Sequence, residues 1–230
     1  MSHPGNGGKN APVSPEAILF DLDGTLVDSE RENVESVVRA ARRLGAELSD
    51  DEQAFVIGHS WNEIHALIAR NHRLTVSMAD LIASAVTEKR DLLAATGYRA
   101  LPGAHAAVRR LGARSALAVV SGASRAEVRD ALESLGVMPA IKLWLGAEDY
   151  ARGKPAPDSF ALAMQRLGVT PSACIAIEDA PPGILSARAA GARVIGVRAG
   201  NFAGYDLSAA DVVVDTLDDV TDQLCDRLVA

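Results

Sequence analysis

The chain has 230 residues, long enough for one large domain or for a domain with a sizeable insertion. Hydrophobic residues make up 48% of it and charged residues 23%, which is typical of soluble globular proteins. The formal net charge of −7 argues against sequence-independent binding to nucleic acid, whose phosphates carry the same sign. No apolar segment reaches the length of a membrane span, so we expect neither nucleic acid nor a membrane as a partner.

Residues 1–14 are polar and rich in glycine, proline and asparagine. They lack the apolar centre of a signal peptide, so we expect a disordered leader and a cytoplasmic protein. The two cysteines, Cys174 and Cys225, lie in an apolar run and in a helical pattern. We interpret both as buried thiols, because this pattern does not support a disulfide framework.

The first apolar run, AILF at residues 17–20, predicts a buried strand. It is followed at once by DLDGT at residues 21–25, which places Asp21 and Asp23 where the strand leaves the core. Side chains alternate along an extended chain, so two acids separated by one residue can approach one bound group from related directions.

Residues 30–96 show the apolar spacing of helices and no strand pattern. Val34, Val37 and Val38 share one face of the first expected helix, and the WNEIHALIAR stretch and residues 78–95 continue the helical pattern. We therefore predict a small helical module inserted into another domain.

The rest of the chain alternates short apolar runs, ALAVV, IKLWLG, ACIAI and RVIGV, with helical patterns. Strands that alternate with helices favour a parallel sheet, and near-continuous apolar runs suit strands that are buried on both faces. We predict an α/β fold: a Rossmann-like parallel sheet core, formed by residues 15–27 and 101–230, with an inserted all-helical cap at residues 28–100. Hinges between the two are expected near residues 26–30 and 97–103.

Ligands of open parallel sheets bind beyond the carboxyl ends of the strands. The polar residues that follow the apolar runs, or lie in the GKPAPD loop, are Asp21, Asp23, Ser121, Gly122, Lys154, Glu178 and Asp179. Carboxylates gathered in one place repel one another unless a cation lies among them. Lys154 supplies one positive charge, and ligation by oxygen alone favours Mg²⁺ as the source of the rest.

Each of these signals also has a purely structural interpretation. Asp and Gly at a strand end commonly form a turn, Glu178 and Asp179 before two prolines can cap a helix, and a loop lysine is usually solvated. These interpretations would all have to hold together at successive strand ends, and we therefore favour a shared site.

DLDGT, the serine of VVSG, the lysine of GKPAPD and the acidic pair of IED resemble, in this order, the four motifs of the haloacid dehalogenase superfamily. The resemblance covers roughly residues 16–228. It is to the branch with a helical cap after the first strand, which includes phosphoglycolate phosphatase and β-phosphoglucomutase-like proteins. It implies that Asp21 is a nucleophile that forms an aspartyl phosphate, and that Asp23 is the general acid and then the general base.

The resemblance also implies a third catalytic residue, Lys154, which would neutralise the nucleophile and the phosphate together. Phosphate would be bound by Thr25, Ser121, Gly122 and Lys154. Mg²⁺ would be held by Asp21, the backbone carbonyl of Asp23, Asp179 and Glu178. In the cap loop, His59 and Trp61 could face the substrate, although an exposed surface loop is the simpler interpretation.

The leading hypothesis is a Mg²⁺-dependent phosphatase that hydrolyses a small phosphorylated metabolite of the sugar-phosphate or phosphoglycolate type. We expect a monomer or weak homodimer. Asp23 favours an oxygen leaving group, because the superfamily's dehalogenases lack this second acid. The alternative is a β-phosphoglucomutase-like isomerase, although Asn33 and Trp61 stand where the mutase has a histidine and an arginine. An inactive phosphate-binding scaffold is a third hypothesis.

Overall fold

The computed structural model of the protein describes residues 14–73 and 75–230, so the expected leader lies, except for Ser14, outside the described residues. At its centre is a six-stranded sheet in the order β5-β4-β1-β6-β7-β8, with every neighbouring pair parallel. In chain order its strands are β1 (Ala17–Phe20), β4 (Ala116–Val120), β5 (Leu143–Leu145), β6 (Cys174–Glu178), β7 (Arg193–Val197) and β8 (Val212–Val214).

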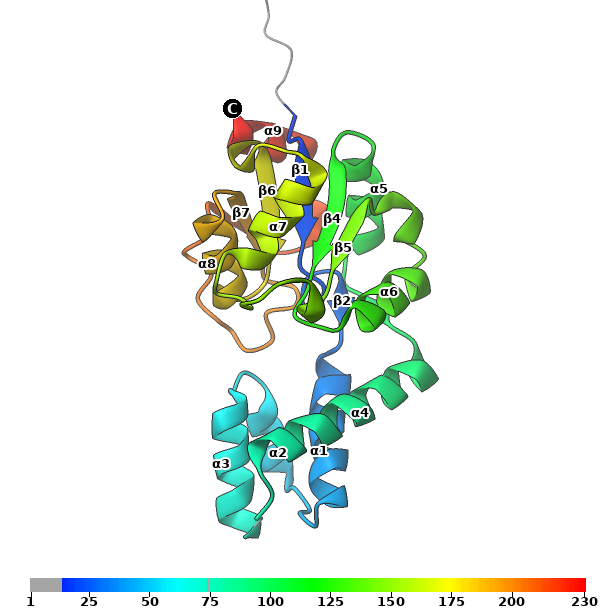
Figure 1. Cartoon of the computed structure of the whole chain (residues 1–230), viewed down its shortest axis with the longest axis vertical. Coiled ribbons are helices and arrows are strands. Elements are labelled where there is room, and N and C mark those ends of the chain that lie inside the picture. Colours follow the sequence, from blue (N-terminus) through cyan, green and yellow to red (C-terminus); the bar gives the residue numbers. More distant parts are fainter. Residues whose placement is uncertain (1–13, 74) are drawn as a thin grey trace, which may run out of the picture.

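The central strands β1 and β6 are buried at every residue, because helices cover both faces of the sheet. On one face pack α5 (Ala104–Gly112), α6 (Arg125–Ser134) and α9 (Asp222–Val229). On the other pack α7 (Asp158–Leu167) and α8 (Pro181–Ala189). Figure 1 shows α7 crossing in front of the sheet.

The register of the central strands fixes where the site lies. Phe20, the last residue of β1, pairs with Val119 of β4 and with Ile177 of β6. The three strands therefore end within one residue of the same level, and the residues that follow Phe20, Val119 and Ile177 lie side by side at the same edge of the sheet.

The segment between β2 (Val27–Asp28) and β3 (Arg99–Ala100) forms a separate helical lobe, the cap (Figure 1). The two short strands are antiparallel neighbours that join the cap to the core. The helices of the cap are α1 (Glu30–Arg43), α2 (Asp50–Val56), α3 (Trp61–His72) and α4 (Met78–Thr96). The cap has its own apolar core, in which Val37, Ile68 and Leu81 are buried.

The sequence predicts this architecture correctly: the α/β class and the Rossmann-like parallel sheet are confirmed. It does not predict β8, which is a half-buried edge strand of three residues and too short for a periodic pattern. It also does not predict β2 and β3, which are two residues long and lie where only hinges are expected.

Among the described residues, none of the helices combines the length and the apolar composition that crossing a membrane requires.

Burial in the central strand predicts the cost of a truncation there. Leu19 of β1 is fully buried, whereas Leu185 on the outer side of α8 is 49% exposed. We expect Leu19→Ala to lower the free energy of unfolding by about 2–5 kcal/mol, because a cavity is left behind. Leu185→Ala, the matched control, should change it by about 0.5 kcal/mol or less. Urea denaturation measures both values, and equal losses would contradict the burial described here.

Candidate active site

Three neighbouring strands bring the first polar residues of the site together. Asp21 follows β1, Ser121 follows β4, and Glu178 ends β6. Strand-like pairing continues into the site, because the N–H of Asp21 donates to the carbonyl of Ile177 at 3.0 Å and the N–H of Ser121 to that of Leu145 at 3.1 Å. The sheet itself therefore positions these residues.

Lys154 lies among these strand ends, with 13% of its side chain exposed. Its ammonium donates to Asp21 Oδ1 at 2.5 Å, to Glu178 Oε1 at 2.6 Å and to the carbonyl of Val120 at 3.0 Å. These bonds use its three donors. Burial alone would lower the pKa of Lys154, but the charges of Asp21 and Glu178 outweigh it and the net direction is upward. Lys154 therefore remains a cation.

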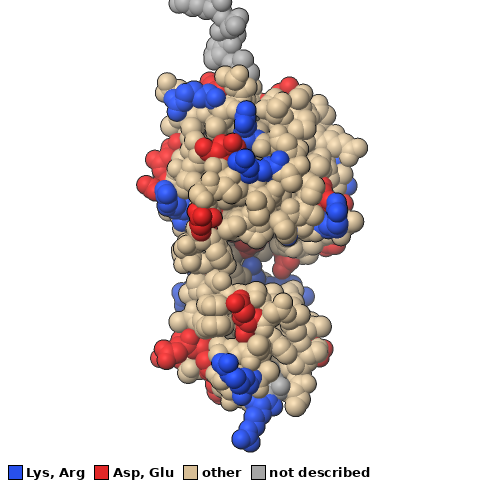
Figure 2. Space-filling view, turned by 90° about the vertical axis from the view of Figure 1, so that its left-hand side faces the viewer, with Lys and Arg blue, Asp and Glu red and all other residues tan. Residues whose placement is uncertain are grey.

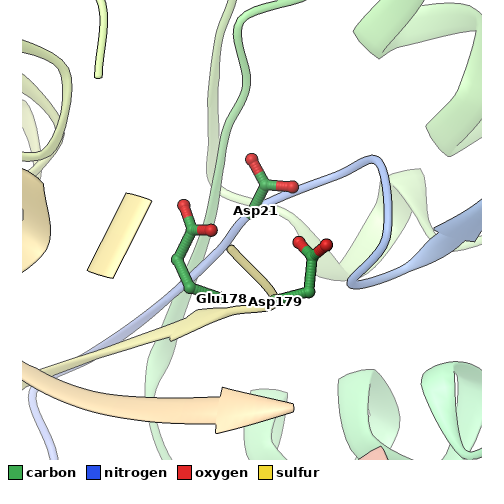
Figure 3. Close-up of side chains that lie close together, drawn as sticks. All are labelled: Asp21, Glu178 and Asp179. Carbon is green, nitrogen blue, oxygen red and sulfur yellow. The ribbon is translucent and has the colours of Figure 1, made fainter. Parts of the chain in front are cut away.

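Asp21, Glu178 and Asp179 form an acidic group, in which the first two are buried and Asp179 is partly buried, and each offers a carboxylate oxygen within 4.8 Å of the others. Figure 3 shows the three carboxyl groups projecting into a common space. Burial, with the negative charge of Glu178, raises the pKa of Asp21 to about 7 against the opposing effect of Lys154. Burial and the charges of Asp21 and Glu178 raise the pKa of Asp179 to about 9. One ammonium does not balance three carboxylates, and a set of oxygen donors alone fits a hard divalent cation.

Two glycines leave room for this acidic group. A Cβ at Gly183 of α8 would collide with the carboxylate of Glu178. A Cβ at Gly24 would lie 2.6 Å from Cγ of Asp179, and Gly24 also has a φ of +84°, which disfavours other residues. The hydroxyl of Thr25 donates to Asp179 Oδ1 at 3.2 Å, so Thr25 orients this acid. Its expected contact with phosphate stays a prediction.

The loop after β4 is held by its own hydrogen bonds. The N–H of Ala123 donates to Ser121 Oγ at 3.0 Å, and the Tyr150 hydroxyl donates to the Ser121 carbonyl at 2.8 Å. Gly122 is exposed, and no atom beyond its chain neighbours lies within 4 Å of where its Cβ would be. This leaves space beside the loop for the phosphate that is predicted to bind at Ser121 and Gly122.

Asp23 contacts the cap. Lys89 of α4 donates to Asp23 Oδ1 at 3.0 Å, and the Ser29 hydroxyl donates to the same oxygen. Burial would raise the pKa of Asp23, but the Lys89 ammonium and the Ser29 hydroxyl lower it by more, so the net direction is downward. Asp23 is therefore held as a carboxylate in this arrangement.

A cavity of about 680 Å³ opens between the cap and the core, beside Asp23 and Gly122. Figure 2 shows the two lobes meeting at a narrow waist, with the surface hollowed beside it. His59 and Trp61 both line this cavity. The cap loop that carries His59 contacts the core, because the Tyr205 hydroxyl donates to the carbonyl of Gly58 at 3.1 Å.

A family model for haloacid dehalogenase-like hydrolases matches residues 15–191, more than half of the chain. The chain belongs to this family. Its membership of the superfamily and its expected enzyme class, a hydrolase, are confirmed.

Two similar proteins are phosphatases by name. Validoxylamine A 7'-phosphate phosphatase of Streptomyces hygroscopicus subsp. limoneus is 36% identical over 214 residues, 88% of this chain and 94% of that protein. Hexitol phosphatase A of Escherichia coli (strain K12) is 37% identical over 212 residues, 90% and 93% of the two chains. The crystal structure of β-phosphoglucomutase from Clostridium difficile has a TM-score of 0.72 at 24% identity, and covers 94% of this chain and 97% of that chain. That last likeness shows the fold alone.

The structure brings the expected core residues of this hydrolase to one edge of the sheet, while the roles assigned to them stay predictions. Three side chains that contact Asp23 or the loop after β4 are not predicted from the sequence: Lys89, Ser29 and Tyr150. Lys89 has no distinguishing signal, because one lysine on an amphipathic helix is usually solvated. Ser29 follows the first motif closely, and that proximity alone could have suggested it.

The pKa shifts predict that cation binding releases protons. Asp21 and Asp179, with pKa values of about 7 and about 9, hold protons below those values in the absence of a cation. A cation must displace these protons, so we expect affinity for Mg²⁺ to fall as the pH drops from about 9 to about 6. Calorimetric titration in two buffers of different ionisation enthalpy measures the proton release. Heats that are independent of buffer at every pH would refute the linkage.

Gly183 provides a steric test of the acidic group. Gly→Ala inside a helix usually stabilises by about 1 kcal/mol, but a Cβ at Gly183 would displace the carboxylate of Glu178. We expect Gly183→Ala to weaken Mg²⁺ binding about tenfold or more, as losses of supporting contacts at metal sites do. Gly153→Ala, whose Cβ would enter open space, is the matched control. An unchanged affinity in Gly183→Ala would show that Glu178 is not needed at the site.

Proposed function

We propose that this hydrolase is a Mg²⁺-dependent phosphatase that releases phosphate from a small phosphorylated metabolite, of sugar-phosphate or polyol-phosphate type, through phosphorylated Asp21. The observation that carries the proposal is the contact of Lys154 with Asp21 beside the acidic group. The names of the two similar phosphatases support an ester of a sugar-like alcohol as substrate.

In the first step, a carboxylate oxygen of Asp21 attacks phosphorus. The new O–P bond forms as the bond from phosphorus to the substrate oxygen breaks, and Asp23 gives its proton to the departing oxygen. In the second step, Asp23 takes a proton from water, whose oxygen attacks phosphorus and releases Asp21. The products are an alcohol and inorganic phosphate, and both acids return to their starting state.

The other residues act by position and charge. Lys154 reduces the negative charge that Asp21 and the phosphoryl oxygens present to each other, and Ser121 with the N–H groups near Gly122 binds those oxygens. Asp21, Glu178, Asp179 and the backbone carbonyl of Asp23 would hold Mg²⁺. Bound there, Mg²⁺ supplies positive charge at the phosphoryl group.

Asp23 must hold a proton for the first step and be ionised for the second. Its pair with Lys89 suits the second state and opposes the first, because a neighbouring ammonium stabilises the carboxylate. Proton donation therefore requires Lys89 to separate from Asp23. Lys89 belongs to the cap and Asp23 to the core, so movement of the cap is the motion that separates them.

The mutase alternative has no observation of its own in its favour. The likeness to β-phosphoglucomutase extends to the fold. Asn33 and Trp61, which stand where the mutase has a histidine and an arginine, both line the cavity. Assays separate the two functions: a phosphatase releases inorganic phosphate from simple esters, whereas a mutase interconverts sugar phosphates when primed with a bisphosphate.

Substitution of the two acids tests the mechanism. We expect Asp21→Asn to lower phosphate release by about 10⁴-fold or more, because the nucleophile is lost. Asp23→Asn should lower it by about 10²–10⁴-fold, the usual contribution of an acid–base group. A chelator should abolish the activity and Mg²⁺ should restore it. Phosphate release with a panel of sugar and polyol phosphates is the measurement.

The matched control is Asp130→Asn on the exposed side of α6, where the carboxylate pairs with Arg129. It should leave phosphate release unchanged. Full activity in Asp21→Asn would overturn the proposal, as would activity that survives complete removal of divalent metal.

A further inference from the structure

The cavity between cap and core carries a charge opposite to that of the catalytic ammonium. Four carboxylates line its wall, those of Asp23, Glu30, Glu127 and Glu148. Among the described residues that line it, Lys89 is the ammonium, and it is already paired with Asp23. Glu30, Glu127 and Glu148 are here called the acidic wall. With Asp23, they make four carboxylates against one lysine among the described residues of this lining, so negative charge is in excess.

Backbone contacts fix two members of the acidic wall. Glu148 Oε2 accepts the N–H of Arg125 at 2.9 Å, and Glu127 Oε2 accepts the N–H of Ser124 at 2.9 Å. The guanidinium of Arg125 donates to Asp149 at 3.1 Å and lies over the ring of Trp144, 5.6 Å from its centroid. The nearby positive charge of Arg125 is therefore engaged elsewhere.

The third member, Glu30, comes from the other side of the cavity. It is the first residue of α1 in the cap and is partly buried. The acidic wall is thus formed from both lobes, and a group bound between them meets negative charge from cap and core alike. Screening by solvent is reduced in such an enclosed space.

The rest of the lining suits an uncharged, hydroxyl-bearing group. The amide of Asn33 can donate to and accept from hydroxyls, and the carboxylates of the acidic wall can accept from them. Trp61 and Ile64 supply apolar surface for carbon-bound hydrogens. The volume, about 680 Å³, lies within the usual range of small-molecule sites.

We propose that the leaving group of the substrate is polyhydroxylated and uncharged or cationic, and that the acidic wall excludes esters that carry a second anionic group. This inference rests on the proposed phosphatase function, because the cavity adjoins Asp23, the acid for the leaving oxygen. Sugar and polyol monophosphates would then be substrates, whereas phosphoglycolate, phosphorylated sugar acids and bisphosphates would be excluded.

Two substrates that differ in one group test the acidic wall. Sorbitol 6-phosphate and 6-phosphogluconate share their carbon chain and phosphate, but the far end is a CH₂OH in one and a carboxylate in the other. We expect kcat/KM to be lower for 6-phosphogluconate by about tenfold or more, because like charges oppose binding. Glucosamine 6-phosphate, which carries an ammonium, should react at least as well as glucose 6-phosphate.

Variants in which glutamine replaces glutamate test whether the acidic wall causes the discrimination between the two esters. The double variant Glu30→Gln/Glu148→Gln should bring the kcat/KM values for sorbitol 6-phosphate and 6-phosphogluconate closer together. The change should come mainly from a lower KM for 6-phosphogluconate. Glu35→Gln on α1, whose carboxylate pairs with Arg39 on the surface, is the matched control and should keep the ratio. In the unaltered protein, a higher salt concentration should also reduce the difference in kcat/KM between the two esters, because salt screens charge. This tests the inference without a substitution.

Binding of the same compounds to Asp21→Asn, measured by calorimetry, distinguishes the two possible failures. Selective binding of the polyol ester without hydrolysis by the unaltered protein would overturn the phosphatase function and leave the acidic wall supported. Equal hydrolysis of both esters, or a ratio unchanged in the double variant and in high salt, would overturn the acidic wall. If a panel of hexitol, pentitol and hexose phosphates is neither bound nor hydrolysed, the substrate class is wrong.

Discussion

The contact of the Lys154 ammonium with Asp21, Glu178 and the carbonyl of Val120 is the interaction on which the site depends. It links three neighbouring strand ends through one cation. Removal of that cation would leave buried carboxylates facing one another without compensation, which is among the most costly arrangements in a protein. Because one ammonium does not balance the acidic group of Asp21, Glu178 and Asp179, the site remains short of positive charge, and a divalent cation with a phosphate ester can complete it.

Much of this site is predictable, because parallel pairing makes strand ends meet. Asp21 and Glu178 follow apolar runs, and a sequence that shows the runs also shows which acids meet. Lys154 comes from a loop, and its place follows from the order of the motifs rather than from any periodic pattern. Lys89 could not be placed from the sequence: it lies 66 residues from Asp23, and their contact depends on how the cap packs over the core.

The acidic wall illustrates the same limit. Glu148 lies in the short helical turn Ala147–Asp149 after β5, and Glu30 begins a helix whose first turn commonly holds acids. Each has an adequate local explanation, and nothing in the sequence brings them to one cavity. The fold follows from patterns within segments, whereas the cavity with its acidic wall forms between segments that the short strands β2 and β3 join.

The proposed acidic wall would divide charge along the substrate path, and that division would favour hydrolysis over isomerisation. At the sheet edge, Lys154 and the expected cation attract a phosphate; in the cavity, Glu30, Glu127 and Glu148 repel one. Under the proposed function, a monoester of a neutral sugar would bind with its phosphate at the sheet edge and its sugar in the cavity. A mutase must retain a bisphosphate and turn it so that either phosphate reaches the aspartate, and the second phosphate would then lie against the acidic wall. Under the proposed function, the alcohol would leave to solvent and water would attack the phosphorus carried by Asp21, which is the course that this distribution of charge favours.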